Sequence, residues 1–365
     1  MAKKDKHMPA SEAELSKVVR AADAPLHIIG GGTRGVAAEG VPLSTAAMSG
    51  ITLYEPGALT MVAQAGTPLA QIEVALAAEN QRLAFEPSDM RALLGTTGEP
   101  TIGGVMAANV SGPRRISVGA ARDFLLGVRY VDGMGQVVKN GGRVMKNVTG
   151  YDLVKLMAGA HGTLGVLSEV SFKVLPRPEM QATLVLHGLD DTAAVAALAR
   201  ALGSPYEVSA AAHDPASGET LLRVEGFEAS VRYRCAELQR LLGGESAVEE
   251  GSEGRWAAWR DVHAFAGVEG DVWRVSCKPS DAPALVARSG AAAVMYDWAG
   301  GLIWLRMAQG SDLRASLGVY DGHAKLVRGA GQQRFEPQAA GVARISAGLR
   351  ARFDPRGLLN RGLMG

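Results

Sequence analysis

The sequence Gly30-Gly31-Gly32-Thr33-Arg34-Gly35 follows a short apolar run, Leu26 to Ile29, and decides how the N-terminal half of the chain is interpreted. It satisfies the G-x-G-x-x-G pattern of dinucleotide-binding folds, in which a helix opens at the third glycine. Here Gly40 and Pro42 follow too soon for such a helix. The stretch therefore predicts a glycine-rich loop whose backbone N–H groups can bind an anion, with a plain tight turn as the alternative.

A second stretch, Thr101-Ile102-Gly103-Gly104-Val105-Met106-Ala107-Ala108-Asn109, combines small residues with a hydroxyl and an amide. Small side chains let backbone N–H groups approach a ligand, and Thr101 and Asn109 can supply directed hydrogen bonds. We expect residues 84–122 to be mostly loop and turn, a length that points to function. Two such loops can hold the two phosphates of a dinucleotide without a helix dipole.

A third segment, Lys146-Asn147-Val148-Thr149-Gly150-Tyr151-Asp152-Leu153, leads to Gly159-Ala160-His161-Gly162-Thr163-Leu164-Gly165-Val166. In their order and spacing over residues 20–178, these motifs resemble the FAD-binding domain of the p-cresol methylhydroxylase and vanillyl-alcohol oxidase type. That resemblance implies two α/β subdomains that clasp an extended FAD, with the flavin ring under a separate cap.

The resemblance also assigns the cofactor contacts. They are Gly30, Gly31, Gly32, Thr33, Arg34, Pro87, Thr101, Gly103, Gly104, Ala107, Asn109, Gly119, Asp123, Gly162, Val166 and Asn360. Family members with covalently bound flavin carry a histidine beside the first glycine loop, where this chain has Thr33-Arg34, so non-covalent FAD is predicted. The chain departs from the family's usual Asn-Pro-Gly ending with Asn360-Arg361-Gly362.

The length of 365 residues predicts two domains, because a single core rarely grows so large. We expect an FAD-binding domain over 1–178, a cap over 179–330, and a C-terminal helix and tail over 331–365 that return to the first domain. Strands and helices alternate in the cap region, which predicts an α+β fold with a mostly antiparallel sheet. The helix expected over 338–353 would bury Val342, Ile345, Leu349 and Phe353.

A closer resemblance is to the E subunits of bacterial glycolate oxidases. It rests on Lys146-Asn147 and Gly150-Tyr151-Asp152 in the FAD domain, and on further stretches in the cap and near the C-terminus. Those further stretches are Trp273-Arg274-Val275-Ser276, Asp297-Trp298-Ala299-Gly300, Gly322-His323-Ala324 and Phe353-Asp354-Pro355-Arg356-Gly357. In such relatives the E subunit works with a flavoprotein D subunit and an iron–sulfur F subunit. The resemblance implies oxidation of glycolate, and of D-lactate in many cases, to the 2-oxo acid.

Oxidation of a 2-hydroxy acid needs a carboxylate anchor, a base for the hydroxyl proton and a flavin to take the hydride. Arg274 and Arg306 are the candidate anchors, because a guanidinium forms the best fork for a carboxylate. His323 is the candidate base, since its imidazole titrates near neutral pH. The alternatives are a salt bridge for each arginine and a structural role for the histidine.

The cap lacks the His and Glu cluster with which catalytic relatives hold a divalent metal, so no metal is expected. Two other functions stay open: a non-catalytic FAD-binding partner of the D subunit, and a self-sufficient FAD-dependent dehydrogenase of another hydroxy acid.

Bulk composition bears on partners and location. Lys plus Arg (38) balances Asp plus Glu (37), which argues against nucleic acid as a partner. No apolar run of membrane-spanning length is present, so membrane attachment is expected only peripherally, through partners. The two cysteines, Cys235 and Cys277, form no CxxC pair. A cytoplasmic location is expected, including the inner face of the cytoplasmic membrane when the chain is part of a complex.

Overall fold

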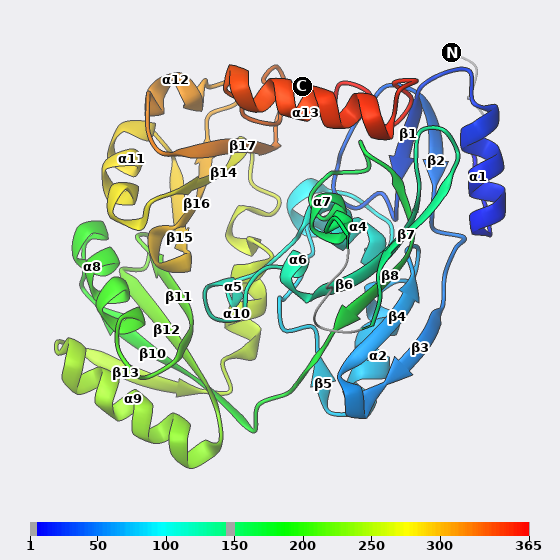
Figure 1. Ribbon diagram of the computed structural model, residues 1–365. Coiled ribbons are helices and arrows are strands. Elements are labelled where there is room, and N and C mark those ends of the chain that lie inside the picture. The colour runs from blue at the N-terminus through cyan, green and yellow to red at the C-terminus, as the bar shows by residue number, and fades with distance from the viewer. Residues whose placement is uncertain (1–5, 144–149, 365) are drawn as a thin grey trace. The chain divides into compact units, whose positions relative to one another are not determined.

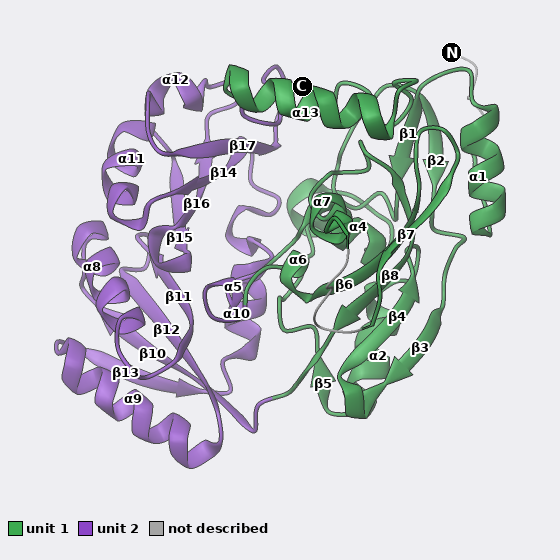
Figure 2. Ribbon diagram, in the orientation of Figure 1, with its two compact units in different colours: residues 1–111, 119–177, 337–365 green, residues 112–118, 178–336 purple. Residues whose placement is uncertain are grey.

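The computed structural model describes residues 6–143 and 150–364, which form two compact units (Figures 1 and 2). Unit 1 comprises residues 1–111, 119–177 and 337–365, and unit 2 comprises 112–118 and 178–336. This division differs from the predicted ranges in two places. Residues 112–118, in the middle of the first range, group with unit 2, and the chain returns to unit 1 at Pro337.

Unit 1 contains a five-stranded sheet in the order β3-β4-β8-β6-β7, with every neighbouring pair antiparallel. Its strands are β3 (Ile51–Glu55), β4 (Thr60–Gln64), β6 (Leu125–Val131), β7 (Val137–Gly141) and β8 (Val166–Lys173). A second pairing joins β5 (Gln81–Arg82) to β9 (Leu175–Pro176). The apolar residues of β8, such as Val170 and Phe172, are fully buried, which fixes this strand at the centre of the sheet.

The other part of unit 1 is a parallel pair, β1 (Leu26–Ile29) with β2 (Val41–Ser44), beside α1 (Glu12–Ala21). Helix α1 begins at Ser11, whose hydroxyl accepts a hydrogen bond from the Glu14 N–H at 3.2 Å. The C-terminal tail runs along the second edge of β1, with the Leu26 N–H donating to the Leu358 carbonyl at 2.7 Å. Strand β1 is thus held on both edges, and it leads directly into the glycine loop.

Residues 84–122 are mostly loop and turn, as expected, but four short helices that the sequence did not indicate lie among them. They are α3 (Arg91–Leu94), α4 (Ile102–Ala108), α5 (Arg115–Val118) and α6 (Ala121–Phe124). The sequence did not predict helix α4, because its small residues show no apolar residues at helical spacing. Capping residues set the two ends of this helix. Thr101 caps its start and Asn109, at φ 48°, closes it in the left-handed region.

Unit 1 also contains α2 (Leu69–Ala78), α7 (Leu153–Met157) and α13 (Ala340–Phe353). The helix expected over 338–353 is present as α13, but two of its four predicted core residues are not buried. Val342 and Ile345 are 53% and 65% exposed, whereas Leu349 and Phe353 are partly buried. The apolar spacing alone predicted a buried face of the helix. It did not show which part of that face would pack against other residues.

Unit 2 is built on an eight-stranded sheet in the order β13-β10-β12-β11-β15-β16-β14-β17. Every pair in it is antiparallel, which confirms the expected α+β cap with a mostly antiparallel sheet. The strands are β10 (Met180–His187), β11 (Val208–Asp214), β12 (Glu219–Gly226), β13 (Ser246–Glu250), β14 (Asp271–Cys277), β15 (Ala293–Asp297), β16 (Leu302–Met307) and β17 (Gly322–Arg328).

Helices cover the sheet of unit 2 with apolar faces that bury residues such as Leu198, Leu238 and Leu285. They are α8 (Asp191–Leu202), α9 (Glu228–Leu242), α10 (Glu253–Arg260), α11 (Ala282–Ser289) and α12 (Leu313–Leu317). Within the described parts of the chain, no helix combines the length and apolar character needed to cross a membrane.

Candidate functional site

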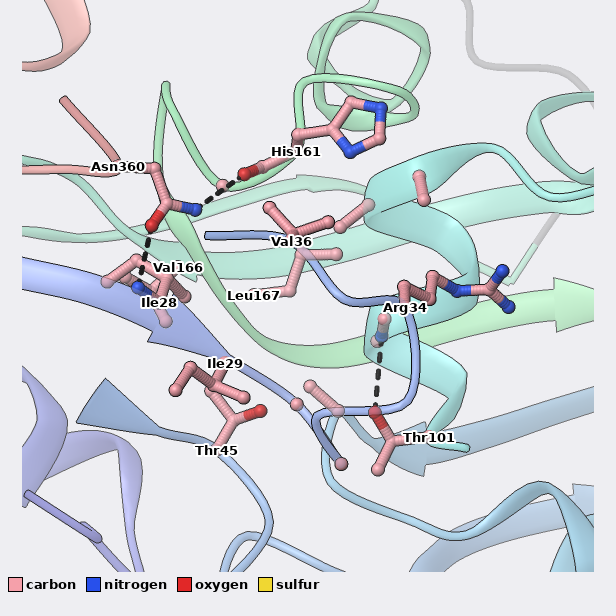
Figure 3. A pocket seen from close by; sticks show the side chains of 18 of the residues that line it. Ile28, Ile29, Arg34, Val36, Thr45, Thr101, His161, Val166, Leu167 and Asn360 are labelled. Carbon is pink, nitrogen blue, oxygen red and sulfur yellow. Dashed lines mark hydrogen bonds between the residues drawn. The ribbon is translucent and has the colours of Figure 1, made fainter. Parts of the chain in front are cut away.

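A cavity of about 1060 Å³, counted with its open side, lies in unit 1, and four chain segments supply most of its lining (Figure 3). The segments are the end of β1 with the glycine loop, helix α4, the approach to β8 with that strand's first residues, and the tail at Asn360. Residues from both ends of the chain therefore build one site.

Twelve of the sixteen residues that the sequence assigned to the cofactor line this cavity. They are Gly30, Gly31, Gly32, Thr33, Arg34, Thr101, Gly103, Gly104, Ala107, Gly162, Val166 and Asn360. The motif Lys146-Asn147-Val148-Thr149 lies outside the described residues.

Close backbone approaches explain the glycines in the first loop. A Cβ on Gly31 would overlap the Glu99 carbonyl, and one on Gly30 would lie 2.6 Å from the Thr101 hydroxyl oxygen. Gly32 has φ 74°, a left-handed backbone that a side chain rarely adopts. These glycines are therefore needed to seat the loop against the chain that leads into α4.

Helix α4 supplies one wall of the cavity. The Thr101 hydroxyl accepts a hydrogen bond from the Gly104 N–H at 3.3 Å, so it caps the helix. A Cβ on Gly103 would lie 2.6 Å from the Ala65 side chain, which shows how closely α4 packs on the chain after β4. Its small residues thus serve helix packing as well as access to the cavity.

The tail closes the cavity through Asn360. Its side-chain oxygen accepts from the Ile28 N–H at 2.7 Å, and its amide nitrogen donates to the His161 carbonyl at 2.7 Å. The His161 N–H in turn donates to the Ala107 carbonyl at 2.9 Å. One asparagine therefore joins β1 to the loop before β8, as the dashed lines in Figure 3 show.

Four assigned residues do not line the cavity. The Asn109 side chain accepts from the Arg122 N–H at 2.9 Å, and the Asp123 carboxylate accepts from the Ala120 N–H at 2.8 Å. Both side chains thereby support the start of α6. Gly119, at φ 92°, lies against Asp123, and Pro87 is outside the lining as well. Their cofactor contacts stay predictions.

The sequence assignment missed other residues of the lining. The apolar ones include Ile28, Ile29, Val36 and Leu167, and the polar ones include His27, whose ring nitrogen Nε2 lies 3.0 Å from the Val36 carbonyl. Ile28 and Ile29 lie on the strand that enters the glycine loop, so the position of the motif could have indicated them. Val36 and Thr45 carried no such signal.

A second group of polar side chains lies in unit 2 on one face of its sheet. Cα partners in antiparallel strands point to the same side, and every second residue of β14 does too. The pairs on this face are Val272 with Arg306, Arg274 with Lys325, and Ser276 with His323. The sheet thus places the three residues predicted to handle a hydroxy acid on one face, with Arg274 and His323 one rung apart and Arg306 on the other side of β14 at the level of Val272.

These three residues differ in their surroundings. Arg274 is half-buried, and burial first, then the charge of Arg115, lowers its pKa to about 10. Burial, followed by the charge of Arg274, also lowers the pKa of His323, although its side chain retains exposure to solvent. Arg306 donates a hydrogen bond to the Glu269 carbonyl at 3.2 Å. The geometry therefore favours Arg274 over Arg306 as an anchor for an anion.

Neither unit presents a recognisable metal centre in its described residues: no three His, Cys, Asp or Glu side chains are grouped closely enough to hold an ion. Cys277 is half-buried with its thiol directed at the Gly300 carbonyl, and burial raises its pKa to about 11. This thiol therefore stays protonated at neutral pH.

Comparison with known proteins identifies relatives for both parts of the chain. Residues 7–141 match a family described as an FAD binding domain. The chain is 35% identical to the glycolate oxidase subunit GlcE of Escherichia coli over 97% of both sequences.

Other relatives match over a smaller part. The glycolate oxidase subunit GlcD of Bacillus subtilis is 34% identical over 35% of this chain and 26% of its own length. A D-lactate dehydrogenase of Anaerostipes hadrus is 34% identical over 40% of this chain and 29% of its own. Among solved structures, an alkyldihydroxyacetonephosphate synthase superposes with a TM-score of 0.67 at 15% identity, covering 97% of this chain and 76% of that one, which shows a common fold.

Proposed function

Because the chain belongs to the family of FAD-binding oxidoreductases that contains the glycolate oxidase subunit GlcE, we propose that it is the FAD-binding subunit of a glycolate-oxidising complex. The complex would convert glycolate, or a related D-2-hydroxy acid, to the 2-oxo acid. The observation that carries this proposal is the match to GlcE, which extends over both units rather than over the FAD-binding part alone.

The cavity of unit 1 fits FAD in its chemistry. Aliphatic side chains such as Ile28, Ile29 and Leu167 form an apolar wall, and the loop from Gly30 to Arg34 adds small residues and a guanidinium. No carboxylate is found among the described residues of the lining, so nothing there repels a diphosphate. Thr33-Arg34 stands where covalent members carry a histidine, which supports non-covalent binding.

FAD, when bound, supplies a hydride acceptor, which is the redox chemistry that oxidation of a hydroxy acid requires. In unit 2, Arg274 would hold the substrate carboxylate with its fork of N–H donors. His323 would accept the proton of the substrate hydroxyl. Its lowered pKa keeps the imidazole neutral, and thus able to act as a base, down to a more acidic pH than usual.

The names of the relatives support a role in a complex. GlcE and GlcD are both called subunits of glycolate oxidase, which supports a complex of more than one chain. We expect this chain to pass electrons to a flavoprotein D subunit and an iron–sulfur F subunit, and to reach a membrane only through them.

One alternative is a non-catalytic FAD-binding partner of the D subunit. It is favoured by the relatives named as D-lactate or D-2-hydroxyglutarate dehydrogenases, because their matches span less than half of this chain.

The test is the absorption spectrum of the purified, FAD-loaded chain before and after glycolate is added without oxygen. Bleaching of the flavin bands would show that this chain has its own substrate site. Flavin bands that persist with glycolate, and bleach only when the D subunit is added, would assign the chemistry to the partner. Bleaching by other alcohols but not by glycolate or D-lactate would contradict the proposed substrate class.

A further inference from the structure

A second cavity of unit 1 is an open groove to which helices α7 and α13 both contribute side chains (Figure 1). Its volume is about 900 Å³, counted with its open side. The lining combines apolar side chains with cations, among them Leu156, Leu349 and Met364 with Arg122, Lys155 and Arg350. Methionine and arginine beside aliphatic side chains are typical of the centre of a protein–protein interface.

The charged groups of this groove are positive. No Asp or Glu occurs among the described residues that line it. The Lys155 ammonium donates to the Arg122 carbonyl, and the Arg350 guanidinium donates to the Met364 carbonyl at 2.9 Å. These bonds position the two cations without cancelling their charge. The Asp123 carboxylate, outside the lining, is 3.9 Å from the Lys155 Nζ and offsets part of one charge.

The segment that forms one side of the groove is basic as well. From Pro337 to Met364 the sequence has five arginines and one carboxylate, Asp354, although the whole chain has 38 basic and 37 acidic residues. Asp354 is 7% exposed, and its carboxylate accepts from the Leu359 N–H at 2.7 Å. An acidic partner would therefore meet opposite charge in the groove and beside it.

The groove shares a wall with the cavity assigned to FAD. The loop before β8 contributes Thr163 and Leu164 to the groove, and Gly162 and Gly165 to the cavity. This loop is internally fixed, because the Thr163 hydroxyl donates to the Ala160 carbonyl at 2.7 Å. A molecule in the groove would thus be separated from the cavity by a single loop.

We propose that this groove docks another protein subunit of the same complex, through a segment that presents carboxylates beside apolar side chains. The inference rests on the proposed function for the existence of that complex. Carboxylates of the partner would pair with Arg122, Lys155 and Arg350. Its apolar side chains would cover Leu156 and Leu349. A hollow of this kind suits a protruding protein segment better than the flat surface of a lipid headgroup layer.

The test is retention of co-expressed D and F subunits, as the probe, on the tagged full-length chain. Ser346→Glu places a carboxylate on the α13 side of the groove, where it repels an acidic partner. We expect the retained amount of the subunits to fall by about tenfold or more. The matched control is Ala347→Glu, because Ala347 is the next residue of the same helix, is exposed and lies outside the lining.

A second variant and the ionic strength guard against a folding artefact. Gln338 is an exposed residue of the lining, and Gln338→Glu changes its charge with little change of shape. This variant should also lower retention, with the circular dichroism and FAD content of the unchanged chain. Retention by the unchanged chain should fall when salt is raised from about 0.1 M to about 1 M, which shortens the screening length to about 3 Å.

The outcomes separate this inference from the proposed function. If glycolate bleaches the flavin and all three variants retain the subunits equally, the inference is overturned and the proposed function stands. If the chain binds no FAD but retains the subunits through the groove, the docking surface stands and the proposed function fails. An unchanged chain that retains neither subunit overturns the inference.

Two other occupants are tested with the same variants. If Ser346→Glu abolishes binding to vesicles that contain phosphatidylglycerol and leaves retention of the subunits unchanged, the groove binds a lipid surface. If it abolishes a dimer seen by sedimentation and leaves retention unchanged, the groove binds a second copy of this chain. Either result overturns the inference.

Discussion

At the scale of single residues, the glycines around the cavity serve different purposes. Gly31 and Gly30 let the first loop approach Glu99 and Thr101, so a side chain there would push two segments apart. Gly32 supplies a left-handed backbone and has room for a side chain. The glycines of this motif are therefore needed first for close packing of the loop, and this packing in turn shapes the ligand cavity.

Substitution of Gly31 by alanine should damage FAD binding because the new methyl group overlaps backbone that cannot move freely. We expect the dissociation constant of FAD, measured by quenching of flavin fluorescence, to rise by about tenfold or more, which corresponds to ~1.4 kcal/mol. Gly57→Ala is the control, since no atom lies within 4 Å of a Cβ there. Equal FAD affinity in both variants would contradict this account of the loop.

The pH profile of substrate oxidation tests His323. Burial and the charge of Arg274 disfavour its protonated form, so its pKa in the folded chain lies below the ordinary 6.5. The rate of flavin reduction by glycolate should therefore fall only as pH drops below that value. His323→Gln should remove this acidic limb and slow reduction by about 10²-fold or more. An acidic limb that persists in His323→Gln would assign the base to another group.

At the scale of elements, the C-terminal tail is part of the cavity, because Asn360 bridges β1 and the loop before β8. Asn360→Asp keeps an acceptor for the Ile28 N–H but loses the donor to the His161 carbonyl. We expect this change to weaken FAD binding by about tenfold, near the value of one or two buried hydrogen bonds. Asn140→Asp is the control, since Asn140 also bridges two backbone groups but lies outside the cavity. Unchanged affinity in Asn360→Asp would show that the bridge is dispensable.

The segment 112–118 depends on the buried pair of Arg114 and Glu225. Arg114→Ala removes one buried ionic partner of the Glu225 carboxylate, which Arg223 also approaches, at 3.5 Å. We expect a loss of about 3 kcal/mol in the free energy of unfolding of unit 2, measured by urea denaturation with far-ultraviolet circular dichroism. Removal of the exposed Arg232 should cost at most about 1 kcal/mol. Equal losses in the two variants would contradict an anchoring role for Arg114.

At the scale of the whole molecule, patterns in the sequence indicated the antiparallel sheet of unit 2 and most of the cavity lining. Alternating strands and the order of the glycine motifs carry that information locally. The transfer of residues 112–118 to unit 2 could not be predicted, since it depends on an ion pair between residues 111 positions apart. The exposure of Val342 and Ile345 was missed for a related reason: apolar spacing shows a face and does not show its partner.

We expect this chain itself to bind FAD without a covalent bond. The most direct measurement is the absorption spectrum of the purified chain after incubation with FAD and removal of excess cofactor by gel filtration. We expect about one flavin per chain, released into solution when the protein is denatured with acid. A chain that is folded and retains no flavin would contradict the claim, and flavin that stays attached after denaturation would contradict its non-covalent part.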